Sequence, residues 1–432
     1  MDGTDTSGGV ALREEDRRTD MDERAIVRER IEKLGRPLNA VVSVLPPSST
    51  CELTGPLAGL PVAVKDMIDI AGQPRGNGNP EDMRGAAAEQ DALVVQRLRA
   101  LGADIVATTA LLEYAAGAQH PDLAEARNPA APQLTAGGSS GGSAALVGSG
   151  AVPAALGTDT GGSIRLPAHY CGVVGFKPSF GLLPVDGVQA LSPTLDHIGF
   201  LTRDVATSRA LFAALTGEAV PKWTSPLRVG VLTSQLTDPR LEPDVRASVT
   251  VAIERLDGPA ELVERDGAPL SRLDELLGTI VQYESWQVHG ETMTTRPEHY
   301  GSTTARAFLA AASVTEEEYA AALARRDSLV PEALALLDGV DVLVGPAAPY
   351  VAPEISPPVD TPEGAIEGIY SGPYNVTGQP AIVIPCGVTA DGLPVGIQLA
   401  AAPGADAALL AVATLVETLL SDRGETLPST GE

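Results

Sequence analysis

Lysine is scarce in this chain of 432 residues. The 30 basic residues include lysine only at positions 33, 65, 177 and 222, and 56 acidic residues outnumber them, which gives a formal net charge of −26. Surfaces that bind nucleic acid or anionic membranes need clustered Lys and Arg side chains, so this charge argues against both kinds of partner. Because arginine does not lose its proton in proteins, we expect such a chain to keep lysine where the chemistry needs an amine.

Cysteine, histidine and long apolar runs are also sparse. Cys51, Cys171 and Cys386 stand far apart with no Cys-x-x-Cys pair, and the five histidines show no short ligand spacing. These patterns argue against a disulfide framework and against a bound metal. Residues 1–20 are polar, and no apolar run reaches the roughly 18 residues of a membrane span. The sequence therefore predicts a reduced, cytoplasmic protein without a metal ion.

Helical and strand-like apolar patterns alternate along the chain, which is typical of an α/β protein. No internal repeat or linker divides it, so we expect a single domain at 21–425 between a flexible tail at 1–20 and a short tail at 426–432. Asp91 is placed to cap a helix at 91–101. Further helices are predicted at 22–34, 142–148, 205–215, 241–256, 315–337 and 405–420, and one begins near Ser163. Strands are predicted at 104–107, 154–157, 340–344, 381–385 and 394–399, and residues 60–70 begin as a strand and end as a loop.

The Gly- and Ser-rich residues 137–141 (GGSSG) match the G-x-S-x-G pattern of an α/β-hydrolase nucleophile. That turn needs an apolar strand directly before it, and residues 132–136 (PQLTA) do not form one. The nucleotide-binding P-loop, the G-x-G-x-x-G fingerprint and the H-E-x-x-H zinc motif are absent as well. We therefore expect no cofactor and no catalytic metal.

A second serine, Ser163, ends the run 157–163 (GTDTGGS), which lies between an apolar strand and a segment that can form a helix. The backbone N–H groups of Thr160, Gly161, Gly162 and Ser163 can point into one small concavity there. A nest of amides at a helix start is what an oxyanion requires, and glycines let a carbonyl group come close to the backbone. On these residues alone, a turn that binds no ligand explains the run equally well.

Lys65 is the candidate base for these serines, because no histidine is suitably placed. It follows residues 61–64 (PVAV), which are apolar or proline, so we expect its ammonium to be partly desolvated at a strand end. Desolvation lowers the pKa of a lysine and favours the neutral amine, which can accept a proton. The alternative interpretation is an ion pair with Asp66 or Asp69 at the surface.

Residues 137–181 (GGSSGGSAALVGSGAVPAALGTDTGGSIRLPAHYCGVVGFKPSFG) resemble the signature segment of the amidase signature family of serine hydrolases. Residues 59–69 (GLPVAVKDMID) resemble the family's lysine segment, and the blocks 195–199 (LDHIG), 375–386 (NVTGQPAIVIPC) and 392–399 (GLPVGIQL) match as well. The resemblance runs from about residue 25 to 420, with a signature core at about 59–200. It implies a large mixed β-sheet covered by helices on both faces.

By this resemblance, Lys65 matches the family's base and Ser139 its shuttling serine, whose preceding peptide bond is cis in the family. Ser163 matches the nucleophile. We expect the amides of Thr160, Gly161 and Gly162 beside it to form the oxyanion hole, and we expect substrate contacts at Gly137 and Gly138. We interpret Asp159 and Arg165, which flank the nucleophile with opposite charges, as a supporting ion pair, with direct substrate contact as the alternative.

The resemblance implies an amidase that hydrolyses a small carboxylic amide to an acid and ammonia or an amine, through an acyl-enzyme on Ser163. Three alternatives stay open: the ammonia-producing component of a tRNA-dependent amidotransferase, an esterase or carbamate hydrolase of the same family, and a binding protein that has kept only the fold. A homodimer is left open as well. Tyr283, Trp286 and His289 share one helical face, which predicts either packing into the core or the wall of an acyl pocket.

Overall fold

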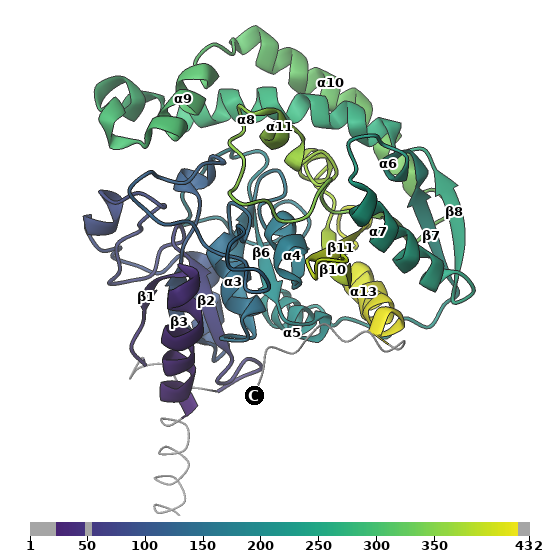
Figure 1. Cartoon of the computed structure of the whole chain (residues 1–432), viewed down its shortest axis with the longest axis horizontal. Helices are drawn as coiled ribbons and strands as arrows, with labels where there is room; N and C mark the ends of the chain where they lie inside the picture. Colours follow the sequence, from purple (N-terminus) through teal and green to yellow (C-terminus); the bar gives the residue numbers. More distant parts are fainter. Residues whose placement is uncertain (1–22, 48–53, 422–432) are drawn as a thin grey trace, which may run out of the picture.

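The computed structural model of the chain describes residues 23–47 and 54–421. Within them, eleven strands form one mixed sheet in the order β1-β3-β2-β4-β6-β5-β10-β11-β9-β7-β8 (Figure 1). The strands are β1 (Val41–Val44), β2 (Pro61–Lys65), β3 (Asp104–Thr109), β4 (Ala154–Asp159), β5 (Val174–Lys177), β6 (His197–Thr202), β7 (Leu227–Leu232), β8 (Ala260–Arg265), β9 (Val342–Pro346), β10 (Ala381–Val388) and β11 (Pro394–Ala400). β2 pairs in parallel with β3 and β4, β7 does so with β8 and β9, and the other neighbours are antiparallel.

Helices connect most of these strands. The α-helices are α2 (Leu93–Ala100), α3 (Gly141–Gly148), α4 (Arg165–Cys171), α5 (Val205–Thr216), α6 (Thr233–Leu236), α7 (Pro243–Leu256), α8 (Ala268–Thr295), α9 (Ser302–Ala311), α10 (Glu316–Leu334), α11 (Pro362–Glu367), α12 (Pro373–Val376) and α13 (Asp406–Ser421). Residues 23–30 are helical and continue into the π-helical turn η1 (Ile31–Gly35). The short 3-10 turns are η2 (Arg36–Leu38), η3 (Asp82–Arg84), η4 (Glu113–Ala115), η5 (Pro297–His299) and η6 (Ala335–Leu337).

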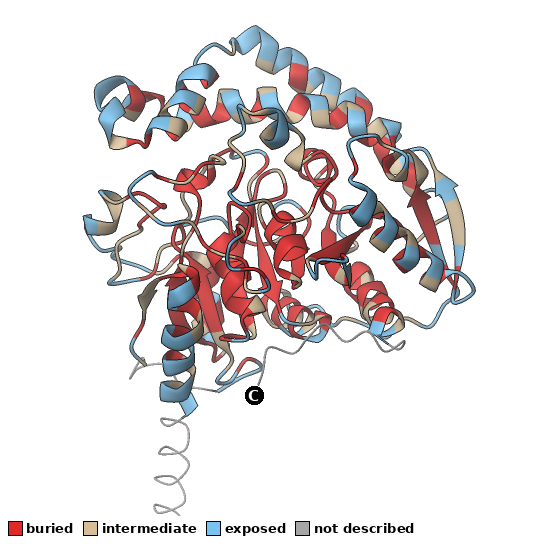
Figure 2. Cartoon of the chain, in the orientation of Figure 1, coloured by how far each residue is buried: buried red, intermediate tan, exposed pale blue. Residues whose placement is uncertain are grey.

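Successive side chains of a strand point to opposite faces of the sheet, and the two faces carry different residues. Val62 and Val64 of β2 join a cluster with α2, α5, α7 and α13, whereas Ala63 between them joins a cluster with η1, α3 and α4. Small alanine side chains on this second face let α3 and α4 lie close to the sheet. The buried core is therefore densest around the sheet, α3 and α4 (Figure 2). The predicted α/β fold with helices on both faces is confirmed.

Most predicted elements are present with shifted ends. Residues 60–70 form β2 and then a loop, as predicted, and the strand ends at Lys65 itself. The predicted cap at Asp91 is wrong, because α2 begins after Ala92 without a side-chain cap, and the Asp91 carboxylate accepts instead from the amide of Ala71 and from Arg99. The helix expected from Ser163 begins two residues later, at Arg165.

Several elements were not predicted. β1 and β5 have four residues each, and β5 contains a glycine, so neither shows a clear alternation. β8 lies at the sheet edge and half of its residues are charged, and the long helix α8 has no side-chain cap at its start. The predicted tails at 1–20 and 426–432 lie outside the described residues, as does Cys51.

Candidate active site

Lys65 is the last residue of β2, and its side chain is completely buried. Its Nζ lies within hydrogen-bond distance of two hydroxyl oxygens, at 2.7 Å from Ser139 Oγ and 2.8 Å from Thr158 Oγ1. Neither Asp66 nor Asp69 forms an ion pair with it in the described part of the chain, so the alternative of a surface ion pair is wrong. The end of β2 thus places a buried amine beside two hydroxyl groups.

Burial lowers the pKa of Lys65 from its ordinary value to about 7, because the charged ammonium loses its hydration. The carboxylates of Asp159 and Asp196 act in the opposite direction but do not compensate. At neutral pH a large share of Lys65 is therefore the unprotonated amine. An amine in that state can take a proton from the neighbouring Ser139.

Ser139 lies in the loop before α3, and the peptide bond between Gly138 and Ser139 is cis. Both preceding glycines are buried in contact with other side chains. A Cβ on Gly137 would come within 2.6 Å of the Tyr170 ring, and one on Gly138 within 2.1 Å of Leu112. The backbone therefore passes through this corner only because these two residues lack side chains.

Ser163 belongs to the turn that follows β4. Its side chain is partly exposed, and its Oγ forms no hydrogen bond with the described residues. The two serine loops are joined through their backbones, because the Ser140 amide donates to the Ser163 carbonyl oxygen at 3.1 Å. Lys65 thus contacts Ser139 directly, and the loop that carries Ser163 lies against the loop that carries Ser139. The hydroxyl groups of Ser139 and Ser163 form no direct hydrogen bond with each other.

The four amides predicted for an oxyanion are not equivalent. Gly162 N–H donates to Asp159 Oδ1 at 2.9 Å, so this donor is already used, contrary to the sequence prediction. The amides of Thr160, Gly161 and Ser163 donate to no group in the part of the chain that the structure describes. Three backbone donors therefore remain available at this turn.

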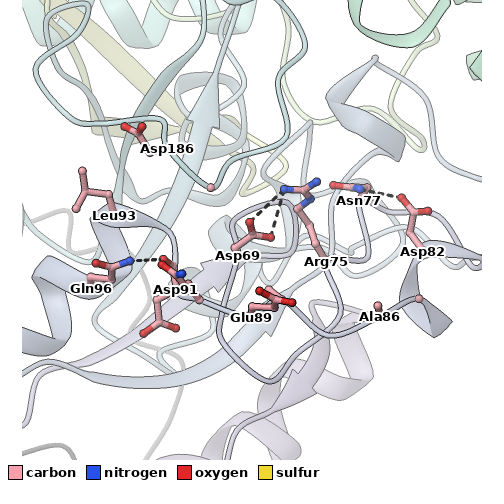
Figure 3. A pocket seen from close by; sticks show the side chains of 14 residues that line it. Asp69, Arg75, Asn77, Asp82, Ala86, Glu89, Asp91, Leu93, Gln96 and Asp186 are labelled. Atoms are coloured by element: carbon pink, nitrogen blue, oxygen red, sulfur yellow. Dashed lines mark hydrogen bonds and ion pairs between the residues drawn. The ribbon is translucent and has the colours of Figure 1, made fainter. Parts of the chain in front are cut away.

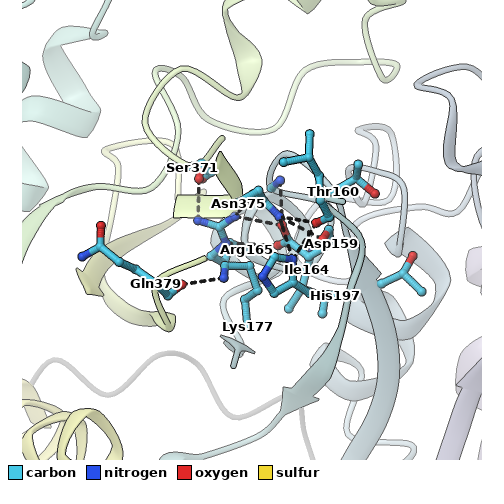
Figure 4. Close-up of polar contacts among 12 residues, drawn as sticks. Asp159, Thr160, Ile164, Arg165, Lys177, His197, Ser371, Asn375 and Gln379 are labelled. Atoms are coloured by element: carbon cyan, nitrogen blue, oxygen red, sulfur yellow. Dashed lines mark hydrogen bonds and ion pairs between the residues drawn. The ribbon is translucent and has the colours of Figure 1, made fainter. Parts of the chain in front are cut away.

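Asp159 holds the turn in place (Figure 4). Its carboxylate accepts from the Gly162 and Ile164 amides, from Arg165 in a two-point ion pair at 2.8 and 3.0 Å, and from Asn375 Nδ2 at 2.9 Å. Both charged side chains of the pair are fully buried. Burial alone would raise the pKa of Asp159, but the Arg165 guanidinium beside it holds that pKa well below its usual range. The predicted supporting ion pair is confirmed.

The C-terminal part of the chain completes this network. Arg165 also donates to the Ser371 carbonyl oxygen at 2.7 Å, to Gln398 Oε1 at 2.9 Å and to Asn375 Oδ1 at 2.7 Å. Asn375 Nδ2 in turn donates to the Asp159 carbonyl oxygen at 2.9 Å. Every guanidinium nitrogen is thereby paired, which is the condition for burying a charge without a large penalty.

Asp196 fixes the other side of the turn. Its carboxylate accepts from Thr160 Oγ1 at 2.6 Å and from the amides of Leu191 and Ser192. Burial raises the pKa of Asp196 to about 6. The Thr160 side chain is thus anchored while its amide stays available.

Gly368, directly after α11, borders the turn, and Glu367 before it contacts Tyr170; no sequence pattern pointed to either residue. A Cβ on Gly368 would lie 2.9 Å from the Gly161 carbonyl oxygen, so a glycine is needed for this close approach. The carboxyl group of Glu367 accepts from Tyr170 Oη at 2.9 Å, and burial raises its pKa to about 7. Only the three-dimensional packing reveals either residue, because more than 200 residues separate them from Gly161 in the chain.

The aromatic face of α8 packs against other helices. Tyr283 stacks on Tyr319 of α10 with ring centroids 4.2 Å apart, and His289 stacks on Phe308 of α9 at 4.3 Å. Tyr114 and Tyr300 touch the same histidine edge-on. These contacts favour the core-packing interpretation of this face over an acyl-pocket wall.

A recess of about 780 Å³ opens at another part of the surface (Figure 3). Its walls include Arg75, which is paired with Asp69, and several further carboxylates, and they include none of Lys65, Ser139 and Ser163. Its size therefore does not identify the site, and the chemistry of the lysine and serines does. Among the described residues, no three His, Cys, Asp or Glu side chains are placed to hold a metal ion together.

Comparison with known proteins gives a consistent picture. A family model described as Amidase matches residues 30–410. The A component of the glutamyl-tRNA(Gln) amidotransferase of Symbiobacterium thermophilum is 34% identical over 404 residues, 83% of this chain and 82% of that protein. Indoleacetamide hydrolase of Pseudomonas savastanoi is 39% identical over 236 residues, 53% of this chain and 51% of that protein. A crystal structure described as an amidase superposes with a TM-score of 0.81 at 34% identity, covering 92% of this chain and 95% of the other. No helix within the described residues is long and apolar enough to cross a membrane.

Proposed function

The chain belongs to the amidase signature family and is an amide-hydrolysing enzyme, and we propose that it cleaves a small carboxylic amide through an acyl-enzyme on Ser163. The observation that carries the proposal is the 2.7 Å hydrogen bond between Lys65 Nζ and Ser139 Oγ, beside the turn that bears Ser163. The buried amine supplies a base, and the partly exposed serine supplies a nucleophile that a substrate can reach.

The proton moves through both serines. Neutral Lys65 accepts the hydroxyl proton of Ser139, and Ser139 accepts the proton of Ser163 as Ser163 Oγ attacks the amide carbonyl carbon. The carbonyl oxygen becomes an oxyanion, which the amides of Thr160, Gly161 and Ser163 stabilise. This charge stabilisation needs donors that no other group occupies, so Gly162 contributes by shaping the turn.

The tetrahedral intermediate then breaks at the carbon–nitrogen bond. An amide anion is a poor leaving group, so the proton held by Lys65 returns through Ser139 to the departing nitrogen. Water attacks the resulting ester, losing its proton through the same relay, and the acid leaves with Ser163 restored. The net reaction consumes one water and forms an acid and ammonia or an amine.

A fluorophosphonate probe tests the nucleophile, because it labels activated serines without requiring the natural substrate. We expect stoichiometric labelling of wild-type protein and none of Ser163→Ala, together with ammonia or amine release from members of a small amide panel by wild type alone. Ser149→Ala, a buried serine at the end of α3, is the matched control and should label normally. Labelling or turnover that persists in Ser163→Ala would refute the assignment.

The similarity to the A components of tRNA-dependent amidotransferases supports a second candidate, in which the ammonia serves a partner protein. Glutamine hydrolysis that is slow in the isolated chain and stimulated by a copurifying protein would favour it. Rapid hydrolysis of simple amides by the isolated chain would favour the independent amidase. The cytoplasmic location and a homodimer stay predictions of the sequence.

A further inference from the structure

Thr158 is the second hydroxyl beside Lys65, and neither the motif nor the mechanism above gives it a task. It lies in β4, directly before Asp159, and its Oγ1 accepts from Lys65 Nζ at 2.8 Å. The same Oγ1 donates its own hydrogen to Met67 Sδ at 3.3 Å. Thr158 and Met67 are only 5% and 1% exposed, so water does not compete for either contact.

A neutral primary amine has one lone pair and two N–H bonds. The proton of Ser139 can move to Lys65 only if the lone pair faces Ser139 Oγ, and the N–H bonds then point elsewhere. Thr158 Oγ1 receives one of them. In the reverse arrangement Thr158 donates to the lone pair, Lys65 donates to Ser139, and no proton can leave Ser139. The distances alone are compatible with both arrangements.

Met67 favours the first arrangement. A threonine hydroxyl has a single hydrogen and two acceptor lone pairs. Once that hydrogen points to Met67 Sδ, only lone pairs face Lys65, and the amine must donate to Thr158. The thioether is a weak acceptor, so it biases the network rather than locking it.

We propose that Thr158 is a positioning residue that turns the Lys65 lone pair towards Ser139, and that Met67 holds the Thr158 hydroxyl in the orientation this requires. The inference rests on the proposed function, in which Lys65 is the base. It assigns a role in proton transfer to two side chains that do not touch the substrate.

Thr158→Val removes the acceptor and keeps the shape of the side chain. We expect the rate of fluorophosphonate labelling and kcat/KM to fall about tenfold to a hundredfold, because a misdirected base loses much of its contribution. Thr158→Ser, which keeps the hydroxyl, should recover most of both rates. Thr109→Val is the matched control, since Thr109 pairs with Lys65 across the sheet but its hydroxyl bonds, among the described residues, only to Ser143. This variant should leave both rates unchanged.

The pH profile separates this role from mere packing. Wild-type activity should fall below about pH 7, where Lys65 becomes protonated. An ammonium gains more from a hydrogen-bond acceptor than an amine does, so losing Thr158 Oγ1 lowers the pKa of Lys65 further. The acid limb of Thr158→Val should therefore move to lower pH. The charged groups that act on Lys65, Asp159 and Asp196, are the same in both proteins.

Met67→Leu tests the second half of the proposal, because leucine fills similar space without an acceptor. We expect a loss of about threefold to tenfold in labelling rate in the wild-type background and no further loss in Thr158→Val, since Met67 acts only through that hydroxyl. Melting temperatures show whether each variant is folded.

Different outcomes overturn different claims. A Thr158→Val protein that labels at the wild-type rate with an unshifted acid limb contradicts the role of Thr158. A Met67→Leu loss of equal size in both backgrounds contradicts the role of Met67. Labelling of Ser163→Ala instead removes the proposed function itself, so the failures can be told apart.

Discussion

Ion pairs occur both in the centre of the molecule and in its outer helices, in very different surroundings. Asp159 and Arg165 are completely buried, whereas Glu275 of α8 and Arg325 of α10 are 61% and 51% exposed at an N–O distance of 3.0 Å. Both members of the buried pair form further hydrogen bonds within the protein, whereas both members of the outer pair are exposed to solvent. The distance between two charges therefore does not determine how much an ion pair contributes to stability. That contribution depends on how completely the two charged groups are hydrogen-bonded.

The same contrast applies to lysines. Lys65 is buried beside two hydroxyls, and Lys33 and Lys222 are exposed. Burial lowers the pKa of Lys65, so Lys65 can lose its positive charge near neutral pH. The three following predictions test these contrasts.

Lys65→Arg should have the largest effect. Arginine keeps a positive charge but cannot act as a base near neutral pH, so kcat/KM at pH 8 should fall by about 10²- to 10⁴-fold. Lys222→Arg makes the same change at an exposed position and should retain full activity. Amide hydrolysis assays on both purified variants provide the measurement, and an active Lys65→Arg protein would rule out Lys65 as the base.

Asp159→Asn should produce the next largest effect, this time on stability. It removes one charge from the buried pair and leaves the Arg165 guanidinium without a counter-charge, which costs about 3–5 kcal/mol of unfolding free energy. Denaturant titration measures this loss directly. A stability within experimental error of wild type would mean that the remaining partners of Arg165 suffice to hold its charge.

Glu275→Gln is the same kind of change at the outer pair and should have the smallest effect. Water solvates Arg325 once its partner is neutral, so the melting temperature should change by less than about 2 °C. Differential scanning calorimetry of this variant beside Asp159→Asn compares the two environments directly. A shift as large as that of the buried variant would contradict the contrast between them.

The sequence predicted the α/β fold and the positions of Lys65, Ser139 and Ser163 from local patterns and a family resemblance. It could not predict that Gly162 N–H donates to Asp159, because the choice between two acceptors depends on the exact path of the turn. Asp91 met the pattern of a helix cap, yet its carboxylate binds Ala71 and Arg99 instead. Local sequence does not reveal such competition between partners.

Long-range partners were the other omission. Nothing in residues 157–165 indicates that Asn375 and Gln398 complete the surroundings of Arg165, since a side-chain pairing of this kind has no periodicity. Thr158 carries no sequence signal of its own for a simpler reason. It stands inside a motif whose neighbours had obvious roles, and only the distance to Lys65 distinguishes it.

The separation between Arg165 and its partners has a consequence for synthesis on the ribosome. Ser371, Asn375 and Gln398 follow Arg165 by 206, 210 and 233 residues. At bacterial and eukaryotic elongation speeds the guanidinium waits roughly 10–40 s for the first of them. β5 waits equally long for β10, its antiparallel neighbour, and exposes an open strand edge meanwhile. We therefore expect the nascent chain to become active only once almost all of it has been made, and a chaperone that shields the β5 edge during translation to limit its association.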